Sequence, residues 1–421
     1  MDDDLNNSKL RSIASLLVAQ FLLAIAGAMI GSILQIFAFE LGATFLLLGL
    51  MTAVQTIMNS ALAPFWGSVS DNAKTRKPFI MFSFFVGSFL TLGYIFVRNI
   101  YELLTLLILG SFIGVIGGPA WNAIISTIGG YRKRARFIGF FLSLSSLGWT
   151  IGLLFSVLIL SFVGIYALFI VAFCLQLASA IIFSLCYHEE RTTTRIRDVI
   201  IHSVYQLKSN WKNAMKKLRS RITHKFDAKK QALLNTNDLF IIALLIAFSS
   251  NAFFLVFSIK LYLILNRNIT MYVLLNAISA LLGTIAPPIY GWIADKISRK
   301  TFFAIFLFIR FTYMILLALL WDPIILAILW ALPIWPGLFV SMRGLIIDLV
   351  GEEKAASGQA IIGSAQSIGA TLGSILGGII ADLLGCYADI HHATILLLVT
   401  PTPFLYSSIR IFKAKLPKKS F

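Results

Sequence analysis

Long apolar runs dominate the pattern of hydrophobic and polar positions along the chain. Twelve of these runs approach or exceed the roughly 20 residues that a helix needs to cross a bilayer. Backbone polar groups in lipid must be satisfied internally, so each run is predicted to be a helix. The predicted spans cover residues 12–37, 44–66, 78–97, 103–127, 137–160, 163–186, 238–260, 270–292, 301–321, 324–348, 356–384 and 391–412.

A polar interval over residues 187–237 divides the predicted spans into six and six. We therefore predict an N-terminal six-helix bundle over 1–186 and a C-terminal six-helix bundle with a basic tail over 238–421. The interval between them is predicted to be a cytoplasmic basic linker. It contains an apolar stripe at helical spacing, flanked by lysines, which indicates an amphipathic helix on the anionic inner leaflet of the bilayer. A solvated linker is the alternative.

Composition agrees with a membrane protein, because only 13% of the residues are charged against about 25% in soluble proteins. The net charge of +17 would suit a nucleic-acid partner, but its distribution does not. With the N-terminus inside, 30 of the 35 lysines and arginines fall on inner segments, as the positive-inside rule requires. We predict a multi-pass plasma-membrane protein with both termini in the cytoplasm and no nucleic-acid partner.

Two loops repeat at a fixed separation in the sequence. One follows the second span and the other follows the eighth. Three residue pairs are each 224 positions apart, namely Pro64 and Pro288, Gly67 and Gly291, and Asp71 and Asp295. One offset of about half the chain indicates a duplicated six-helix unit.

Both loops resemble the Gly-x-x-x-Asp-(basic)-x-Gly-(basic)-(basic) segment of major facilitator superfamily transporters. The first copy has Asn72 in place of the first basic residue and Lys74 in place of the second glycine, and the second copy has Ser298 at that glycine. The resemblance spans the chain. It implies an all-α fold of twelve transmembrane helices in two pseudo-symmetric bundles. It also implies alternating access around a central cavity lined mainly by spans 1, 4, 7 and 10.

The repeated loops are predicted to form a conformational latch. A glycine at the end of a span lets a neighbouring helix approach, and the aspartate four residues later can pair with a basic residue or cap a helix. Asp348 resembles an aspartate that the family places opposite the basic residues of the span-8 loop. The predicted latch residues are Gly67, Asp71, Arg76, Gly291, Asp295, Lys296 and Asp348. The stronger latch is expected in the C-terminal bundle, which keeps both Lys296 and Asp348.

Ionisable residues inside spans are functional candidates, because burying them in a membrane is costly. Arg343 in span 10 would suit an anionic ligand. Its alternatives are an ion pair with Asp348 or Glu352, or an extended side chain that reaches the inner surface. Arg310 lies in the middle of span 9, which the family resemblance places at the periphery, so packing is the favoured interpretation there.

Neutral polar and aromatic residues complete the predicted binding site. Each of them could instead make an ordinary interhelical hydrogen bond or packing contact. With Arg343, the predicted binding residues are Asn122, Asn251, Gln20, Gln55, Trp121 and Gln366, and the same reasoning applies to Asn59, Asn276 and Trp335.

The predicted function is transport of a small molecule across the plasma membrane by a monomer, as an exporter of amphipathic compounds. The proton is a candidate coupling ion, although the central parts of spans 1, 4, 7 and 10 contain no carboxylate. One alternative is an organic-anion or metabolite permease that uses Arg343, and another is a non-transporting receptor or scaffold. No nucleophile–base set, phosphate loop or metal-ligand spacing is present, so no enzyme activity, cofactor or metal is expected.

Overall fold

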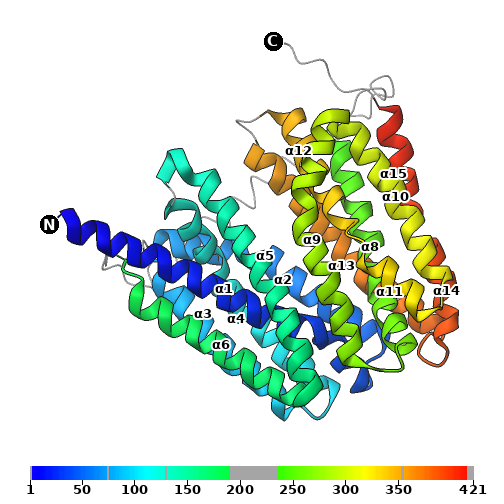
Figure 1. Cartoon of the computed structure of the whole chain (residues 1–421), viewed down its shortest axis with the longest axis horizontal. Coiled ribbons are helices and arrows are strands. Elements are labelled where there is room, and N and C mark those ends of the chain that lie inside the picture. Colours follow the sequence, from blue (N-terminus) through cyan, green and yellow to red (C-terminus); the bar gives the residue numbers. More distant parts are fainter. Residues whose placement is uncertain (1, 74, 129, 190–235, 352–354, 415–421) are drawn as a thin grey trace.

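The computed structural model describes residues 2–73, 75–128, 130–189, 236–351 and 355–414 (Figure 1). Within these ranges the secondary structure is helical, without strands, and twelve segments are long and apolar enough to span a membrane. The first six spans are α1 (Asp2–Glu40), α2 (Phe45–Asn72), α3 (Lys77–Gly93) with the short η1 (Tyr94–Phe96), α4 (Ile100–Ile128), α5 (Gly130–Phe162) and α6 (Ile165–Cys186).

The second six spans follow the linker, whose predicted amphipathic helix lies outside the described residues. They are α8 (Thr236–Ile264), α9 (Ile269–Ile297), α10 (Arg299–Leu319), α11 (Pro323–Ala331) with α12 (Trp335–Val350), α13 (Ala355–Leu383), and η4 (Ile390–His392) with α14 (Ala393–Val399) and α15 (Thr402–Lys413). Spans 9 and 10 are separate helices, as the sequence predicted.

Prolines interrupt two spans that look continuous in the hydropathy pattern. Span 10 breaks between α11 and α12 around Pro333, and the last span breaks between α14 and α15 at Pro401. Proline has no backbone N–H to donate, so each proline removes one bond of the helical hydrogen-bond ladder and favours a break there. The carbonyl of Pro333 instead accepts a hydrogen bond of 3.0 Å from the Tyr290 hydroxyl of α9.

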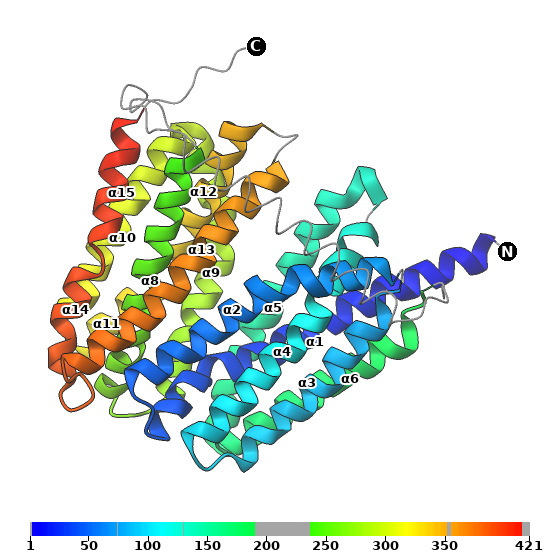
Figure 2. The ribbon, with the colours of Figure 1, turned by 180° about the vertical axis from the view of Figure 1, so that it is seen from behind.

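The two halves of the molecule meet at one end and diverge toward the other (Figures 1 and 2). We call the first the turn end. It carries the short connections 41–44, 97–99, 163–164, 265–268, 320–322 and 384–389. The opposite end, here the termini end, carries the first residues of α1 and the last residues of α15.

An aspartate from one half caps a helix of the other half at the turn end. The backbone N–H groups of Phe45 and Leu46, which begin α2, each donate a 2.9 Å hydrogen bond to the carboxylate of Asp382 in α13. The N–H of Leu47 donates to the Thr44 hydroxyl. The exposed N–H groups of a helix start thus gain acceptors, and a carboxylate there also interacts favourably with the helix dipole.

Other contacts join the halves at the same end. Arg267 lies 3.6 Å from Glu40 as a surface ion pair, and the Gln35 amide donates a 3.0 Å hydrogen bond to the Leu255 carbonyl. Exposed ion pairs contribute at most about 1 kcal/mol. The buried and helix-capping contacts therefore contribute more than the ion pair to holding the two halves together at the turn end.

Glycines bring α2 and α13 into backbone contact across the halves. A Cβ added at Gly49 would lie less than 3.0 Å from the Ser374 carbonyl, and one added at Gly378 would lie equally close to the Phe45 carbonyl. Real Cβ atoms essentially never approach so closely. The turn end therefore closes only because these positions have no side chain.

The glycine stripe of span 11 packs within its own half. Added Cβ atoms at Gly369, Gly373 and Gly377 would each lie less than 3.0 Å from the α8 backbone. In the first half, Gly148 and Gly152 bring α5 close to α1, because added Cβ atoms there would lie 3.0 Å or less from the α1 backbone. Because spans 5 and 1 correspond to spans 11 and 7, both halves use glycines for the same internal interface.

Lys260 caps the end of a neighbouring helix. This lysine is the last residue of the predicted span 238–260, and in the structure it lies inside α8 and is fully buried. Its ammonium group donates hydrogen bonds to the carbonyls of Leu317, Ala318 and Leu320 at 3.1, 2.7 and 3.0 Å. These carbonyls lie at the C-terminal end of α10, where the ladder leaves acceptors free and the dipole favours a cation.

Replacing Lys260 with methionine is expected to destabilise the C-terminal half. The change keeps the apolar stem but leaves three carbonyls without this donor, at a cost of about 1–3 kcal/mol. The melting temperature of the purified protein in detergent should fall. The exposed Arg267→Gln is the control: it removes only the surface ion pair with Glu40, so it should lower the stability by at most about 1 kcal/mol. Equal melting of the two variants would contradict a capping role for Lys260.

Candidate functional site

A cavity of about 590 Å³ lies between the two halves. This volume falls within the roughly 300–1,000 Å³ that is typical of small-molecule pockets. The first half contributes small and polar residues of α1 and α5, with Trp149 and Leu153. The second half contributes residues of α8 to α12. The described lining consists of Gly31, Ser32, Ser146, Trp149, Thr150, Leu153, Phe254, Tyr272, Asn276, Ser279, Ala280, Gly283, Thr284, Arg310, Tyr313, Trp330, Leu332 and Trp335.

Arg310 supplies the charge of the cavity wall. Its side chain is 9% exposed, and its guanidinium carbon lies 4.6 Å from the ring centre of Phe254 and 5.3 Å from that of Tyr313. The Nε group has no hydrogen-bond partner in the described structure. A buried donor without an acceptor costs about 1–3 kcal/mol, so Arg310 is held here at an energetic cost.

Aromatic rings form the wall beside Arg310. Trp330 of α11 stacks on Phe257 with ring centres 5.4 Å apart, and its edge meets Phe254 at 5.8 Å. The indole N–H of Trp330 donates a 3.3 Å hydrogen bond to Asn276 of α9. Packing and this hydrogen bond together fix the plane of the indole at the cavity surface.

Two glycines make room for the other cavity tryptophans. Gly31 of α1 faces the ring of Trp149, and Gly283 of α9 faces the ring of Trp335. A Cβ at either glycine would come within 3.2 Å of the indole. Nearby, the hydroxyls of Thr150 and Thr284 lie 3.3 Å apart and connect α5 to α9 across the halves.

Of the neutral and aromatic residues that the sequence suggested, Asn276 and Trp335 line this cavity, whereas the six predicted with Arg343 are not among its described lining residues. Gln20 joins Ser145 and Trp121 by hydrogen bonds of 2.8 and 3.0 Å inside the first half. Asn251 bonds the Ala247 carbonyl of its own helix. Asn122 is exposed on α4, Gln366 is half-buried on α13, and Gln55 lines a smaller cavity of about 170 Å³ that shares Gly31 with the larger one. Their role in binding stays a prediction.

The two arginines inside spans lie in different environments. Arg343 is exposed on α12, with its guanidinium carbon 3.8 Å from the ring centre of Phe339, and it forms no ion pair with a described residue. Arg310 lies on the cavity wall, although the family arrangement had placed its span at the periphery. The sequence marked both Arg310 and Arg343 in the same way, as charges inside predicted spans. Only the packing of α10 shows that Arg310, and not Arg343, lies on the cavity wall.

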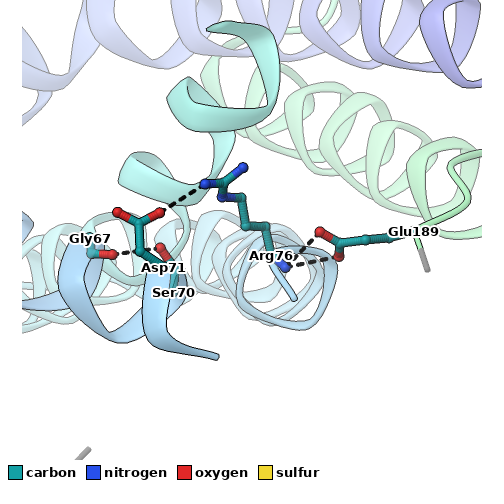
Figure 3. A network of polar contacts seen from close by, with 5 residues as sticks. All are labelled: Gly67, Ser70, Asp71, Arg76 and Glu189. Carbon is teal, nitrogen blue, oxygen red and sulfur yellow. Dashed lines mark hydrogen bonds and ion pairs between the residues drawn. The ribbon is translucent and has the colours of Figure 1, made fainter. Parts of the chain in front are cut away.

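The first repeated loop holds an ion pair (Figure 3). Arg76 donates a 2.8 Å hydrogen bond to the carboxylate of Asp71, whose side chain is 63% exposed. The hydroxyl of Ser70 donates to the carbonyl of Gly67. An added Cβ at Gly67 would make only ordinary contact with Pro119, and one at Gly291 would meet nothing within 4 Å. The close helix approach expected at these two glycines is therefore not found.

A glutamate after α6 caps α3 beside this pair. The backbone N–H groups of Arg76 and Lys77 donate to the carboxylate of Glu189 at 2.7–2.9 Å (Figure 3). The sequence had suggested that Asp71 would either pair with a basic residue or cap a helix. In the structure Asp71 pairs with Arg76, and Glu189 caps the helix. Burial and the Glu189 charge raise the pKa of the adjacent Tyr187 to about 12, so its phenol stays protonated at neutral pH.

The second repeated loop reaches α12. Arg299 lies 3.1 Å from the carboxylate of Asp348, and the ammonium of Lys296 lies 3.6 Å from the ring centre of Trp292. The side chain of Asp295 lies outside the described residues. The relative strength of the two latches therefore stays a prediction.

The fold and the cavity define a polytopic helical membrane protein whose two similar halves enclose a small-molecule pocket. Residues 16–222 and 239–418 match the family model described as Major Facilitator Superfamily. The chain belongs to the major facilitator superfamily, so the predicted family and fold class are confirmed. Members of this family are transporters and not enzymes.

Solved transporters share this fold. The chain aligns with a bacterial homologue of the human lysosomal transporter Spinster, solved in an inward-facing and unoccupied conformation, with a TM-score of 0.71 and 13% identity over 98% of this chain and 99% of that one. It aligns with the nucleoside transporter NupG with a TM-score of 0.70 and 12% identity over 97% and 100%. Identities this low establish the fold alone. A comparison with curated protein sequences finds no match.

Proposed function

We propose that this protein carries a small amphipathic organic molecule across the plasma membrane by alternating access, with the cavity between the halves as its binding site. One observation carries the proposal. The pocket is lined by both halves, and the contacts of Asp382, Gly49 and Gly378 close the turn end. Breaking these contacts and closing the termini end would open the pocket to the other side.

The direction of opening follows from the charge distribution. The basic residues of the sequence gather at the termini end, which the positive-inside rule assigns to the cytoplasm. The arrangement with a closed turn end would then be the state that loads from the cytoplasm. Together with the aromatic and polar wall of the cavity, loading from the cytoplasm supports export of amphipathic compounds.

Flux measurements test the proposal. The purified protein is reconstituted into proteoliposomes, and uptake and efflux of a panel of aromatic anions, cations and neutral compounds are measured with and without an imposed pH gradient. Protein-dependent flux of at least one compound is expected, and stimulation by the gradient would assign the proton as coupling ion. Absence of flux for every compound, in vesicles where the protein is shown to be folded, would contradict the proposal.

Arg343 is the alternative anion site, and a single substitution distinguishes it from the cavity. If Arg343 binds substrate, Arg343→Gln should reduce flux about tenfold or more, because a charge-assisted bond is lost. We expect flux to change less than twofold, because the guanidinium lies outside the described cavity wall. Selective loss of anion flux in Arg343→Gln would instead assign the anion-binding site to α12.

A further inference from the structure

Arg310 is a buried cation that the described protein leaves without a counter-charge. It is 9% exposed and forms no ion pair, and its Nε has no acceptor. The carboxylate side chains that the structure describes in its half lie near helix ends and do not line the cavity. They are Asp238, Asp322, Asp348, Asp382 and Asp389. A lone charge in a membrane interior is costly and marks a functional position.

The cavity side of Arg310 is open to a ligand. The residues that line the described cavity together with Arg310 include no aspartate, glutamate, lysine or histidine, and the other ionisable groups are the phenols of Tyr272 and Tyr313. Phe254 and Tyr313 contact the guanidinium through their ring faces. Such contacts favour a cation but give its N–H groups no oxygen acceptor. An oxyanion would supply both the missing charge and the missing acceptors.

The neighbouring rings indicate the body of this ligand. Trp330 and Phe254 border the space beside Arg310, and Trp149 and Trp335 border the cavity elsewhere. Asn276 holds the Trp330 indole in place. Fixed aromatic faces favour a flat, aromatic partner, and the guanidinium fork matches a carboxylate through two parallel hydrogen bonds.

We propose that the cavity binds an aromatic monocarboxylate, with the carboxylate on Arg310 and the ring against Trp330 and Phe254. This inference rests on the proposed function only in taking the cavity as the substrate site. It assigns specificity to α10, whereas the sequence had favoured Arg343 on α12.

Matched ligands test the charge requirement on the unaltered protein. The protein is placed in nanodiscs of phosphatidylcholine, and calorimetry measures binding of 1-naphthoate against 1-naphthamide and of indole-3-acetate against indole-3-acetamide. Each carboxylate should bind about tenfold or more tightly than its amide, because only the carboxylate pairs with the guanidinium. Equal affinities within a pair, or no binding of either carboxylate, would overturn the proposal.

Variants locate the binding. Arg310→Gln should remove the preference for the carboxylate, and Arg310→Lys, which keeps the charge but not the fork, should retain part of it. The exposed Arg98→Gln is the control and should bind like the parent. Retained preference in a folded Arg310→Gln protein would overturn the proposal. If Arg310→Gln does not fold, the proposal is still tested by the ligand pairs on the unaltered protein and by Arg310→Lys.

The outcomes separate this inference from the proposed function. Binding that depends on Arg310 without flux in proteoliposomes would leave the carboxylate site standing and contradict transport. Flux of neutral compounds only, unchanged by Arg310→Lys, would leave transport standing and contradict the carboxylate site.

Discussion

Gly49→Ala is expected to impair transport strongly while leaving the protein folded. The added methyl group would collide with the Ser374 carbonyl across the halves, and overpacking of this kind costs about 1–3 kcal/mol. Separation of the halves at the turn end relieves the collision, so the substitution acts on the conformational equilibrium. Flux should fall about tenfold or more, whereas the melting temperature should stay close to that of the parent.

Gly373→Ala is the matched comparison. Its methyl group would collide equally closely with the Phe248 carbonyl, but α13 and α8 belong to the same half. No movement between the halves relieves that collision, so this variant should melt earlier. Equal thermal destabilisation by the two alanines would contradict the assignment of Gly49 to a moving interface.

The conformational shift can be measured directly. Spin labels on cysteines introduced at Arg98 and Ala388 report the distance between the halves at the turn end, in a background where the exposed Cys174 and Cys186 are replaced by serine. Gly49→Ala should lengthen this distance and Gly373→Ala should not. An unchanged distance in Gly49→Ala would exclude the proposed opening.

Asp382→Asn is expected to weaken closure of the turn end. The amide keeps one acceptor oxygen, so one of the two helix-capping bonds and the full negative charge are lost. Hydrogen bonds to charged groups contribute about 1.5–3 kcal/mol, and a change of 1–3 kcal/mol shifts an equilibrium about 5- to 150-fold. Hydrogen exchange at the amides of Phe45 and Leu46 should therefore accelerate.

Asp389→Asn is the control for that measurement. Its carboxylate caps η4 by accepting from the His391 N–H at 2.8 Å, within one half. Exchange at the start of α2 should stay at the parent rate in this variant. If hydrogen exchange at Phe45 and Leu46 also stayed at the parent rate in Asp382→Asn, contacts other than the Asp382 cap would hold the turn end closed.

Much of the fold was predictable because it depends on local composition. The length of an apolar run determines whether a helix can span the bilayer, and the repeated loops carry the family resemblance. Hydropathy averages over several residues, so it did not reveal the breaks at Pro333 and Pro401, although both prolines are visible in the sequence.

Outside the repeated loops, the contacts of charged residues were not predictable, because they join distant parts of the chain. Lys260 ends a predicted span, and only its contacts with the end of α10 explain why it is buried. The pairing of Asp382 with the start of α2 joins positions 337 residues apart. Arg310 was recognised as a charge within a span, but the sequence contains no information on which side of α10 faces the cavity.

We also expect the charge of Arg310 to make transport sensitive to membrane voltage. Moving one elementary charge through 100 mV changes the free energy by about 2.3 kcal/mol, and a guanidinium that shifts through part of the field feels a fraction of this. A bound carboxylate would cancel the charge. Voltage would then act on the conformational change of the empty protein and not on that of the protein with bound carboxylate. The membrane potential would therefore set the rate at which the empty protein returns to its loading state.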